Sequence, residues 1–404
     1  MISKFLVAAL TACFLLGAVP GAFAADAKLE PSSAVRKNLV AAQTANSKKD
    51  FPAALAAIEA AKQVADRTPH DNYLINRFAA SVYVGMKDLD AATPAAEAAA
   101  DTDPAAIPDT EKAAIYNLAM QLAMNAKHFD KAAKYGKALM ALTPPPSSTD
   151  MSLIARANFF NQDYPGAIEV SQKNIDAAIA AGQKPQRGDF QVLMSAQAQM
   201  KDDAGAQKTL EQAVATFNQP EDWDRIVPIA FTTPGMREID YIHMGRLMFL
   251  LGGKIRPEDA SLIGATANKL GLLGDTQQAE KAGGTGFTPV GTRADADKKT
   301  IPAQIAAGAK ENGTYNVKLA EALYGYGMYP QAIAAAQLGK SKGGAADPTE
   351  ADMVIGMSQA ASGKYSEAVA TFGAINAPKP AAARVVRLWI VFAKSKANPT
   401  TAAN

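Results

Sequence analysis

The spacing of apolar residues along the chain predicts short helices joined by tight turns. Around residues 317–340, Leu319, Leu323 and Tyr324 recur at helical spacing and mark one apolar face. Gly327 ends this helix, because glycine tolerates the backbone geometry of a helix-ending turn. A second helical pattern begins directly afterwards, so the segment is predicted to form two consecutive helices.

The turn between two such helices carries a phrase that returns along the chain. A polar residue or glycine comes first, an aromatic or other apolar residue follows in most copies, and an alanine closes the phrase. The closing alanines are 38, 40, 35, 39, 73, 53 and 36 residues apart. A period of about 36 residues is typical of helical repeat arrays, which build binding surfaces. The eight copies lie at residues 49–54, 87–92, 127–132, 162–167, 201–206, 274–279, 327–332 and 363–368.

The clearest units resemble the tetratricopeptide repeat. Ile355 and Gly356 stand where that family has a Leu-Gly pair, and Ala368 and Phe372 reproduce its Ala-x-x-x-Phe step. The resemblance implies an all-α fold, a right-handed α-solenoid of tetratricopeptide-like helix pairs with a C-terminal capping helix. The capping helix is expected around Trp389, and the alternative is a helix there that docks another envelope protein.

The repeat pattern also predicts how the chain is organised. The 73-residue gap between Ala206 and Ala279 is expected to hide one degenerate helix pair near 222–251. The Gly-rich stretch that follows lacks the strand and the Lys-Ser/Thr of a phosphate cradle, so it is interpreted as a flexible loop. The expected segments are a signal peptide at 1–24, an N-terminal array of about seven helix pairs at 25–281, a Gly-rich insertion at 282–302, and C-terminal repeat pairs with the capping helix at 303–396.

The first residues have the three parts of a secretory signal peptide. Lys4 precedes an apolar run at 5–19, and Ala22 and Ala24 form an A-x-A cleavage site. We therefore expect cleavage after Ala24 and a location in the periplasm. The alternative is lipidation at Cys13, because the residues before it resemble a lipoprotein processing box. No later stretch is long and apolar enough to span a bilayer, so the mature chain is expected to have no transmembrane segment.

Charge and histidine content argue against several classes of function. The chain has 41 basic and 39 acidic residues, and loss of Lys4 with the signal peptide leaves 40 − 39 = +1. Because it has no dense basic run, nucleic acid is not an expected partner. His70, His128 and His243 are far apart and have no second ligand at metal-binding spacing, so no metal or cofactor is expected.

The short catalytic motifs H-E-x-x-H and the P-loop are missing from the sequence. G-x-S-x-G occurs once, at residues 339–343, after a segment predicted to be helical and not after the strand that a nucleophile turn needs. We therefore do not expect an enzyme. The alternative that stays open is an enzyme whose site is assembled from residues distant in sequence.

Candidate binding residues follow from the tetratricopeptide resemblance. In that family the first helix of each pair lines a concave groove, which implies that its positions five, nine, twelve and thirteen face a bound segment. Arginine beside aromatic residues is a common composition of binding hot spots. The alternatives are that Phe160 packs between repeats and that Arg156 is a solvated charge. The candidates are Arg77, Arg156, Phe160, Gln191, Glu321 and Tyr324.

A narrower resemblance covers about the C-terminal half. The stretch from Asp222 through Asp259 to Glu280, the segment 338–348 and the ending at Trp389 resemble a group of periplasmic tetratricopeptide proteins of Gram-negative bacteria. Some members of that group are associated with TonB–ExbB–ExbD uptake systems. The resemblance implies a periplasmic scaffold or adaptor that binds protein segments, with envelope transport proteins as candidate partners. The rival hypotheses are an envelope-assembly lipoprotein tethered through Cys13 and the enzyme with a dispersed site.

Overall fold

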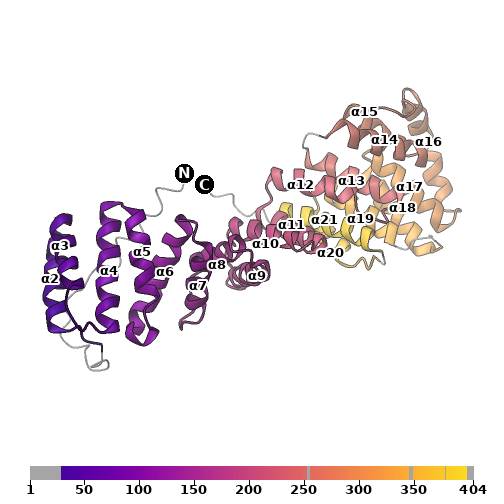
Figure 1. Cartoon of the computed structure of the whole chain (residues 1–404). Coiled ribbons are helices and arrows are strands. Elements are labelled where there is room, and N and C mark those ends of the chain that lie inside the picture. Colours follow the sequence, from indigo (N-terminus) through magenta and orange to yellow (C-terminus); the bar gives the residue numbers. More distant parts are fainter. Residues whose placement is uncertain (1–28, 253–254, 345–348, 378, 398–404) are drawn as a thin grey trace. The chain divides into compact units, whose positions relative to one another are not determined.

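The computed structural model describes residues 29–252, 255–344, 349–377 and 379–397. Over these residues the chain forms twenty α-helices, α2 to α21, one short 3-10 helix and no strand (Figure 1). The predicted all-α fold of tetratricopeptide-like helix pairs is therefore confirmed. No helix in the described segments is long and apolar enough to cross a membrane. The predicted signal peptide and Cys13 lie outside the described residues.

The chain divides into two compact units, unit 1 (Met1–Ala206) and unit 2 (Gln207–Asn404). In unit 1, helices that follow one another in sequence pack side by side as pairs. The helices of this unit are α2 (Ser33–Ser47), α3 (Phe51–Lys62), α4 (Pro69–Met86), α5 (Leu89–Ala100), the 3-10 helix η1 (Pro104–Ala106), α6 (Asp109–Asn125), α7 (Phe129–Met140), α8 (Ser148–Phe160), α9 (Tyr164–Ala180) and α10 (Arg187–Gln199).

The repeated phrase forms the turn inside each pair. Its first residue has a left-handed backbone, with φ of +64° at Lys87 and +63° at Gln162. The next residue caps the second helix, and the Asp88 carboxylate accepts a hydrogen bond of 3.0 Å from the N–H of Ala91. The closing alanine is the fourth residue of the second helix, where it is fully buried between helices, as at Ala92.

A second regular feature fixes the contact between successive repeats of unit 1. An acidic residue is the third residue of α4, α6, α8 and α10, at Asp71, Glu111, Asp150 and Asp189. Each carboxylate accepts a hydrogen bond from the preceding repeat, for example from the N–H of Ser32 to Asp71 at 2.9 Å. Burial by itself raises the pKa of Asp71, but hydrogen bonds from Thr68 and Ser32 lower it below its ordinary value.

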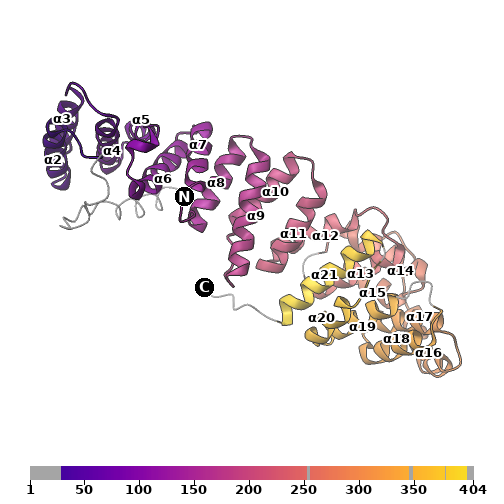
Figure 2. The same cartoon turned by 90° about the horizontal axis from the view of Figure 1, so that it is seen from below.

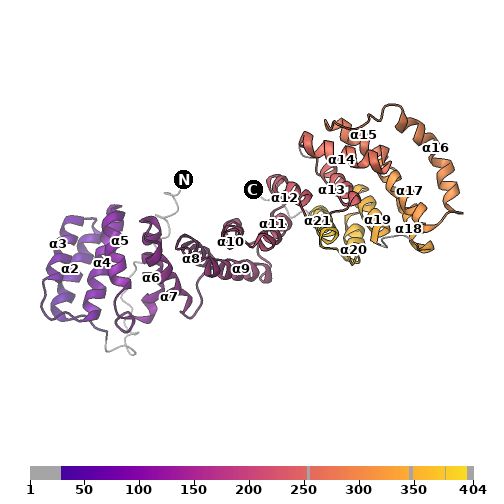
Figure 3. The same ribbon diagram turned by 45° about the vertical axis from the view of Figure 1, so that its right-hand side comes forward.

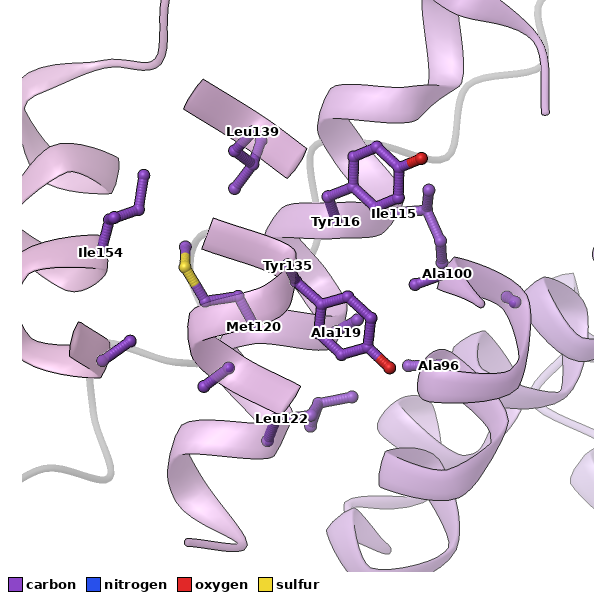
Figure 4. Packing of buried hydrophobic residues seen from close by; sticks show 14 of the residues in the cluster. Ala96, Ala100, Ile115, Tyr116, Ala119, Met120, Leu122, Tyr135, Leu139 and Ile154 are labelled. Atoms are coloured by element: carbon purple, nitrogen blue, oxygen red, sulfur yellow. The ribbon is translucent and has the colours of Figure 1, made fainter. Parts of the chain in front are cut away.

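The core of unit 1 is built from small and aromatic side chains between the helix pairs. Figure 4 shows side chains of α5, α6, α7 and α8 converging, with Met120, Tyr135 and Ile154 among them. All three are almost completely buried. Alanines such as Ala119 fill the remaining space, which lets the helices approach closely.

Unit 2 contains more irregular connections. The helix α11 (Asp203–Phe217) spans the division, and the others follow within the unit. They are α12 (Pro220–Phe231), α13 (Glu238–Leu251), α14 (Pro257–Leu270), α15 (Leu273–Lys281), α16 (Arg293–Gly308), α17 (Gly313–Gly325), α18 (Tyr329–Lys342), α19 (Thr349–Ala361), α20 (Tyr365–Gly373) and α21 (Pro380–Ala397).

Helix α13 is enclosed by the rest of unit 2. Every residue from 242 to 248 is buried, so no side of the helix faces solvent over two turns. It packs against α12, α14 and α21 (Figures 2 and 3). The indole N–H of Trp389 on α21 donates to the carbonyl of His243 at 3.1 Å.

The last helix of unit 2 returns to its beginning. On α21, Arg387 donates to Glu211 of α11 through Nε at 2.8 Å, although the two residues are 176 apart in sequence. Arg384 donates to Gln207 at 2.8 Å and to Thr233 at 2.9 Å. Unit 2 is therefore closed by contacts between its first and last helices.

Two details differ from the sequence expectations. The phrase expected at 274–279 is out of register by three residues, because the turn is at Gly271, with φ of +74°, and the buried fourth residue of α15 is Thr276. The Gly-rich segment 282–302 is only partly a loop, since α16 begins at Arg293. Its loop is also packed, and a Cβ on Gly264 of α14 would come within 2.2 Å of the Phe287 ring.

Candidate binding cleft

Unit 1 has a cleft with a volume of about 1100 Å³ that we call the first-helix cleft. One face of α6 forms its floor, with Ala113, Ala114 and Leu118 as small or apolar positions. Arg77 of α4 lines one side, and the loop at 141–147 with the start of α8 lines the other. The cleft is therefore formed mainly by α6 and the loop before α8, with only a few positions from the first helices of the pairs on either side.

From the second helix pair onward, the ninth residues of the first helices form a row across unit 1. They are Arg77 of α4, Asn117 of α6, Arg156 of α8 and Ser195 of α10, spaced by 40, 39 and 39 residues. We call these four residues the ninth-position row. Asn117 lines the cleft together with Arg77, but the sequence analysis did not select it. Counting 40 residues on from Arg77 would have found it, although the repeated phrases around α6 are unevenly spaced.

Arg77 is held in place by an acidic and an aromatic neighbour. Its Nη1 lies 3.2 Å from Oε1 of Glu111, and the Tyr73 hydroxyl donates to Oε2 of the same carboxylate at 2.6 Å. Burial and the hydrogen bond to Glu111 raise the pKa of Tyr73 well above its usual range, so the phenol keeps its proton. The side chain of Arg77 remains 17% exposed at the wall of the cleft.

A chain of polar contacts crosses the cleft from α6 to α8. The amide of Gln121 donates to Asn117, and the amide of Asn117 donates to the carboxylate of Asp150. Ser147 donates to the same carboxylate at 2.7 Å. Gln121 is the thirteenth residue of α6 and lies one turn beyond Asn117, so both half-buried amides are on the cleft face.

Arg156 and Phe160 lie on the neighbouring helix α8, one turn apart. Arg156 is exposed, and no hydrogen-bond or ion-pair partner is found for it among the described residues. Phe160 is 45% exposed, but its ring also stacks on Phe129 with centroids 5.0 Å apart. Phe160 therefore packs between repeats through part of its ring, and the rest of the ring is exposed. Gln191 is exposed on α10.

The expectation that Glu321 and Tyr324 serve as groove anchors is wrong, because the structure buries both. They are the ninth and twelfth residues of α17, at 5% and 3% exposure. Arg246 of α13 binds the Glu321 carboxylate, and its guanidinium carbon lies 4.3 Å from the centre of the Tyr324 ring. The two side chains face a helix of their own unit, so they are not available to a partner.

Arg246 is the centre of a buried charge cluster. Asp275 of α15 accepts two hydrogen bonds from it, both of 2.8 Å, and His243 binds Glu321 at 2.9 Å. We call Arg246, His243, Asp275, Glu321 and Tyr324 the Arg246 cluster. Burial alone would raise the pKa of Glu321, but Arg246 and His243 outweigh it and lower that pKa to about 2. The cluster links α13 to α15 and α17.

In the described part of the chain, no group of three or more histidine, cysteine or acidic residues could hold a metal ion.

Comparisons with known proteins add little to this geometry. No family model matches the chain, and no curated protein matches it. Among solved structures it is similar to the TPR2AB domain of yeast Sti1 in complex with pHSP90, at 16% identity over 70% of this chain and 99% of that one, with a TM-score of 0.25. It is also similar to the P58(IPK) TPR domain, at 14% identity over 91% and 99% with a TM-score of 0.23, and to Naa15/Naa10 bound to HypK-THB, at 10% identity over 86% and 70% with a TM-score of 0.27.

Proposed function

We propose that unit 1 is a scaffold that binds a segment of another protein along its first-helix face, without catalysis. The observation that carries this proposal is the first-helix cleft of about 1100 Å³, whose lining comes from three successive repeats. Its volume is at the upper limit of small-molecule sites, which measure roughly 300–1000 Å³. A cleft of that size and repeat origin suits a chain segment better than a metabolite.

One exposed charge of the first-helix face, Arg156, favours an acidic residue in the bound segment. Arg77 and Arg156 both belong to the ninth-position row, and the second of them is exposed and unpaired within the described structure. Unit 2 provides a precedent inside the same chain, because Glu321, the ninth residue of α17, binds Arg246 of a helix that lies against it. In unit 1 the charges would be exchanged. The ninth residue Arg156 is the cation, and a carboxylate of the partner would pair with it.

The setting of this scaffold is part of the proposal. The signal-peptide pattern at 1–24 and the resemblance of the C-terminal half to periplasmic repeat proteins support a periplasmic adaptor that is accessory to an envelope transport complex. N-terminal sequencing of the mature protein tests the location, and a first residue at position 25 is the expected result. A lipid-modified residue at position 13 would instead favour the lipoprotein alternative.

Site-specific crosslinking tests where the partner binds. A photo-crosslinking residue at Gln121 on the cleft floor should capture a partner in intact cells, because the amide lies on the binding face. The matched control is the same residue at Glu169, which is exposed on the second helix α9. Capture at position 169 and none at 121 would contradict the proposal.

A further inference from the structure

Unit 2 contains a second and smaller cleft, which is separate from the one assigned to segment binding. It lies between α12, α13, the start of α14 and the end of α21, and it has a volume of about 430 Å³. Trp223, Val227, Met248 and Leu251 give it an apolar lining. We call it the α12–α14 cleft.

The tryptophan of this cleft is fixed in position. Trp223 is only 5% exposed, and its indole N–H donates to the side-chain oxygen of Asn218 at 3.0 Å. The ring also meets Phe392 of α21 edge to face, with centroids 6.4 Å apart. A rigid aromatic surface beside the flexible side chain of Met248 is suited to a compact apolar group.

Four charged residues line the cleft, and two of them neutralise each other. Arg256 binds Asp259 through two hydrogen bonds of 2.7 Å. The other two, Asp224 and Lys396, are exposed. Within the described residues, Asp224 has no hydrogen-bond or ion-pair partner and Lys396 has no carboxylate in ion-pair range. Among its described residues, the cleft therefore presents one carboxylate and one ammonium that are not neutralised by an ion pair.

We propose that the α12–α14 cleft binds a small zwitterion with a compact apolar group, the chemistry of a free apolar α-amino acid. The ligand's ammonium pairs with Asp224, its carboxylate pairs with Lys396, and its side chain lies against Trp223 and Met248. The volume is near the lower end of small-molecule sites, roughly 300–1000 Å³, which favours a single small molecule over a chain segment. A ligand with only one charge would leave either Asp224 or Lys396 unmatched.

Titration of the full-length protein with three matched probes tests the charge requirement. L-Leucine has both charges, 4-methylpentanoate lacks the ammonium, and 3-methylbutylamine lacks the carboxylate. We expect L-leucine to bind by calorimetry and to change the tryptophan emission. The change should disappear in Trp223→Phe, while the buried Trp389, the second of the two tryptophans, stays as the internal reference. Asp224→Asn and Lys396→Gln should each weaken binding about tenfold, the loss of one charge-assisted contact.

Three results would overturn the proposal. The first is that neither L-leucine nor L-phenylalanine binds at about 10 mM, where even a millimolar site would be filled. The second is that either single-charge probe binds as tightly as L-leucine, and the third is that binding survives both charge substitutions. Thermal unfolding of the two variants is the control for folding, because Asp224 and Lys396 are exposed and their replacement should leave stability unchanged. None of these results bears on segment binding by unit 1.

Discussion

In unit 1 the ninth residues of the first helices are at least partly exposed, whereas in unit 2 Glu321 at the same position is buried. The local sequence is comparable in the two cases, a polar residue on one face of a short helix. The difference is that α13 contacts this face of α17 in unit 2, while the corresponding face of the described first helices of unit 1 remains open at the cleft. The same repeat position can therefore stay exposed or become part of the core, depending on whether another helix of the chain covers it.

Removing the arginine at the centre of the Arg246 cluster should cause the largest loss of stability in unit 2. Arg246→Met leaves the buried Asp275 without its ion-pair partner and leaves the buried Glu321 with His243 alone, and breaking such a buried pair costs about 3–5 kcal/mol. We expect unit 2 to unfold at much lower urea concentration. Both tryptophans, Trp223 and Trp389, belong to unit 2, so tryptophan emission reports on this unit alone.

The matched control for that measurement is Arg225→Met, because Arg225 is exposed on α12 of the same unit. Its loss should change the free energy of unfolding by less than about 0.5 kcal/mol. If the two substitutions had equal effects, the buried cluster would not be what holds α13 in place.

Acid should weaken unit 2 through Glu321. Its pKa is lowered from 4.5 to about 2 in the folded protein, so the unfolded state binds the proton more readily. The stabilisation is present above about pH 4.5 and is lost as the pH falls towards 2, and the shift corresponds to about 3 kcal/mol. Urea midpoints followed by tryptophan emission from pH 6 down to about pH 2.5 check this. Glu321→Gln should flatten the curve in this window, and an unchanged slope would contradict the assignment to Glu321.

The regular parts of the fold could be predicted because they depend on neighbours in sequence. The left-handed residue at Lys87, the cap at Asp88 and the buried Ala92 lie within six positions, so a short phrase records all three. The contact of Arg246 with Glu321 joins residues 75 apart, and no periodic signal records it. The nearly continuous apolar run in α13 did carry a signal, since a helix that is apolar on all sides is usually buried.

The candidate site was predictable to a similar degree. The repeat register placed Arg77 correctly at the cleft, and it placed Arg156 and Gln191 on first helices where they are exposed but do not line the cleft. Asn117, which lines the cleft, was missed where the spacing of the phrases is uneven. Helix α16 was missed because only every seventh residue of it is buried. These residues are Ala294, Ile301 and Gly308, and they form a very narrow stripe along the helix. Such a narrow stripe cannot be told from a polar loop by periodicity alone.

Charge reversal in unit 1 should change binding without changing stability. Arg156→Glu replaces an exposed side chain, and with an acidic partner segment we expect the affinity to fall by about 1–3 kcal/mol. The measurement is the affinity of the crosslinked partner, once identified, for the wild type and the variant. Gln191→Ala, on the next first helix, is the milder companion variant. Unchanged affinity in both would move the binding surface away from the first-helix face.

The smallest expected effect concerns the turns, which differ in residue type between the units. Unit 1 has lysine or, at Gln162, glutamine in the left-handed position, as at Lys87 with φ of +64°, and unit 2 has glycine, as at Gly363 with φ of +77°. A side chain costs roughly 1–2 kcal/mol in this conformation, and the greater freedom of unfolded glycine offsets about 0.5–1 kcal/mol of that. Lys87→Gly should therefore stabilise unit 1 by about 0.5 kcal/mol, and Gly363→Lys should destabilise unit 2 by a similar amount. Circular dichroism follows the first change, because unit 1 has no tryptophan, and tryptophan emission follows the second. Stabilisation of unit 2 by Gly363→Lys would show that turn strain does not distinguish the two units.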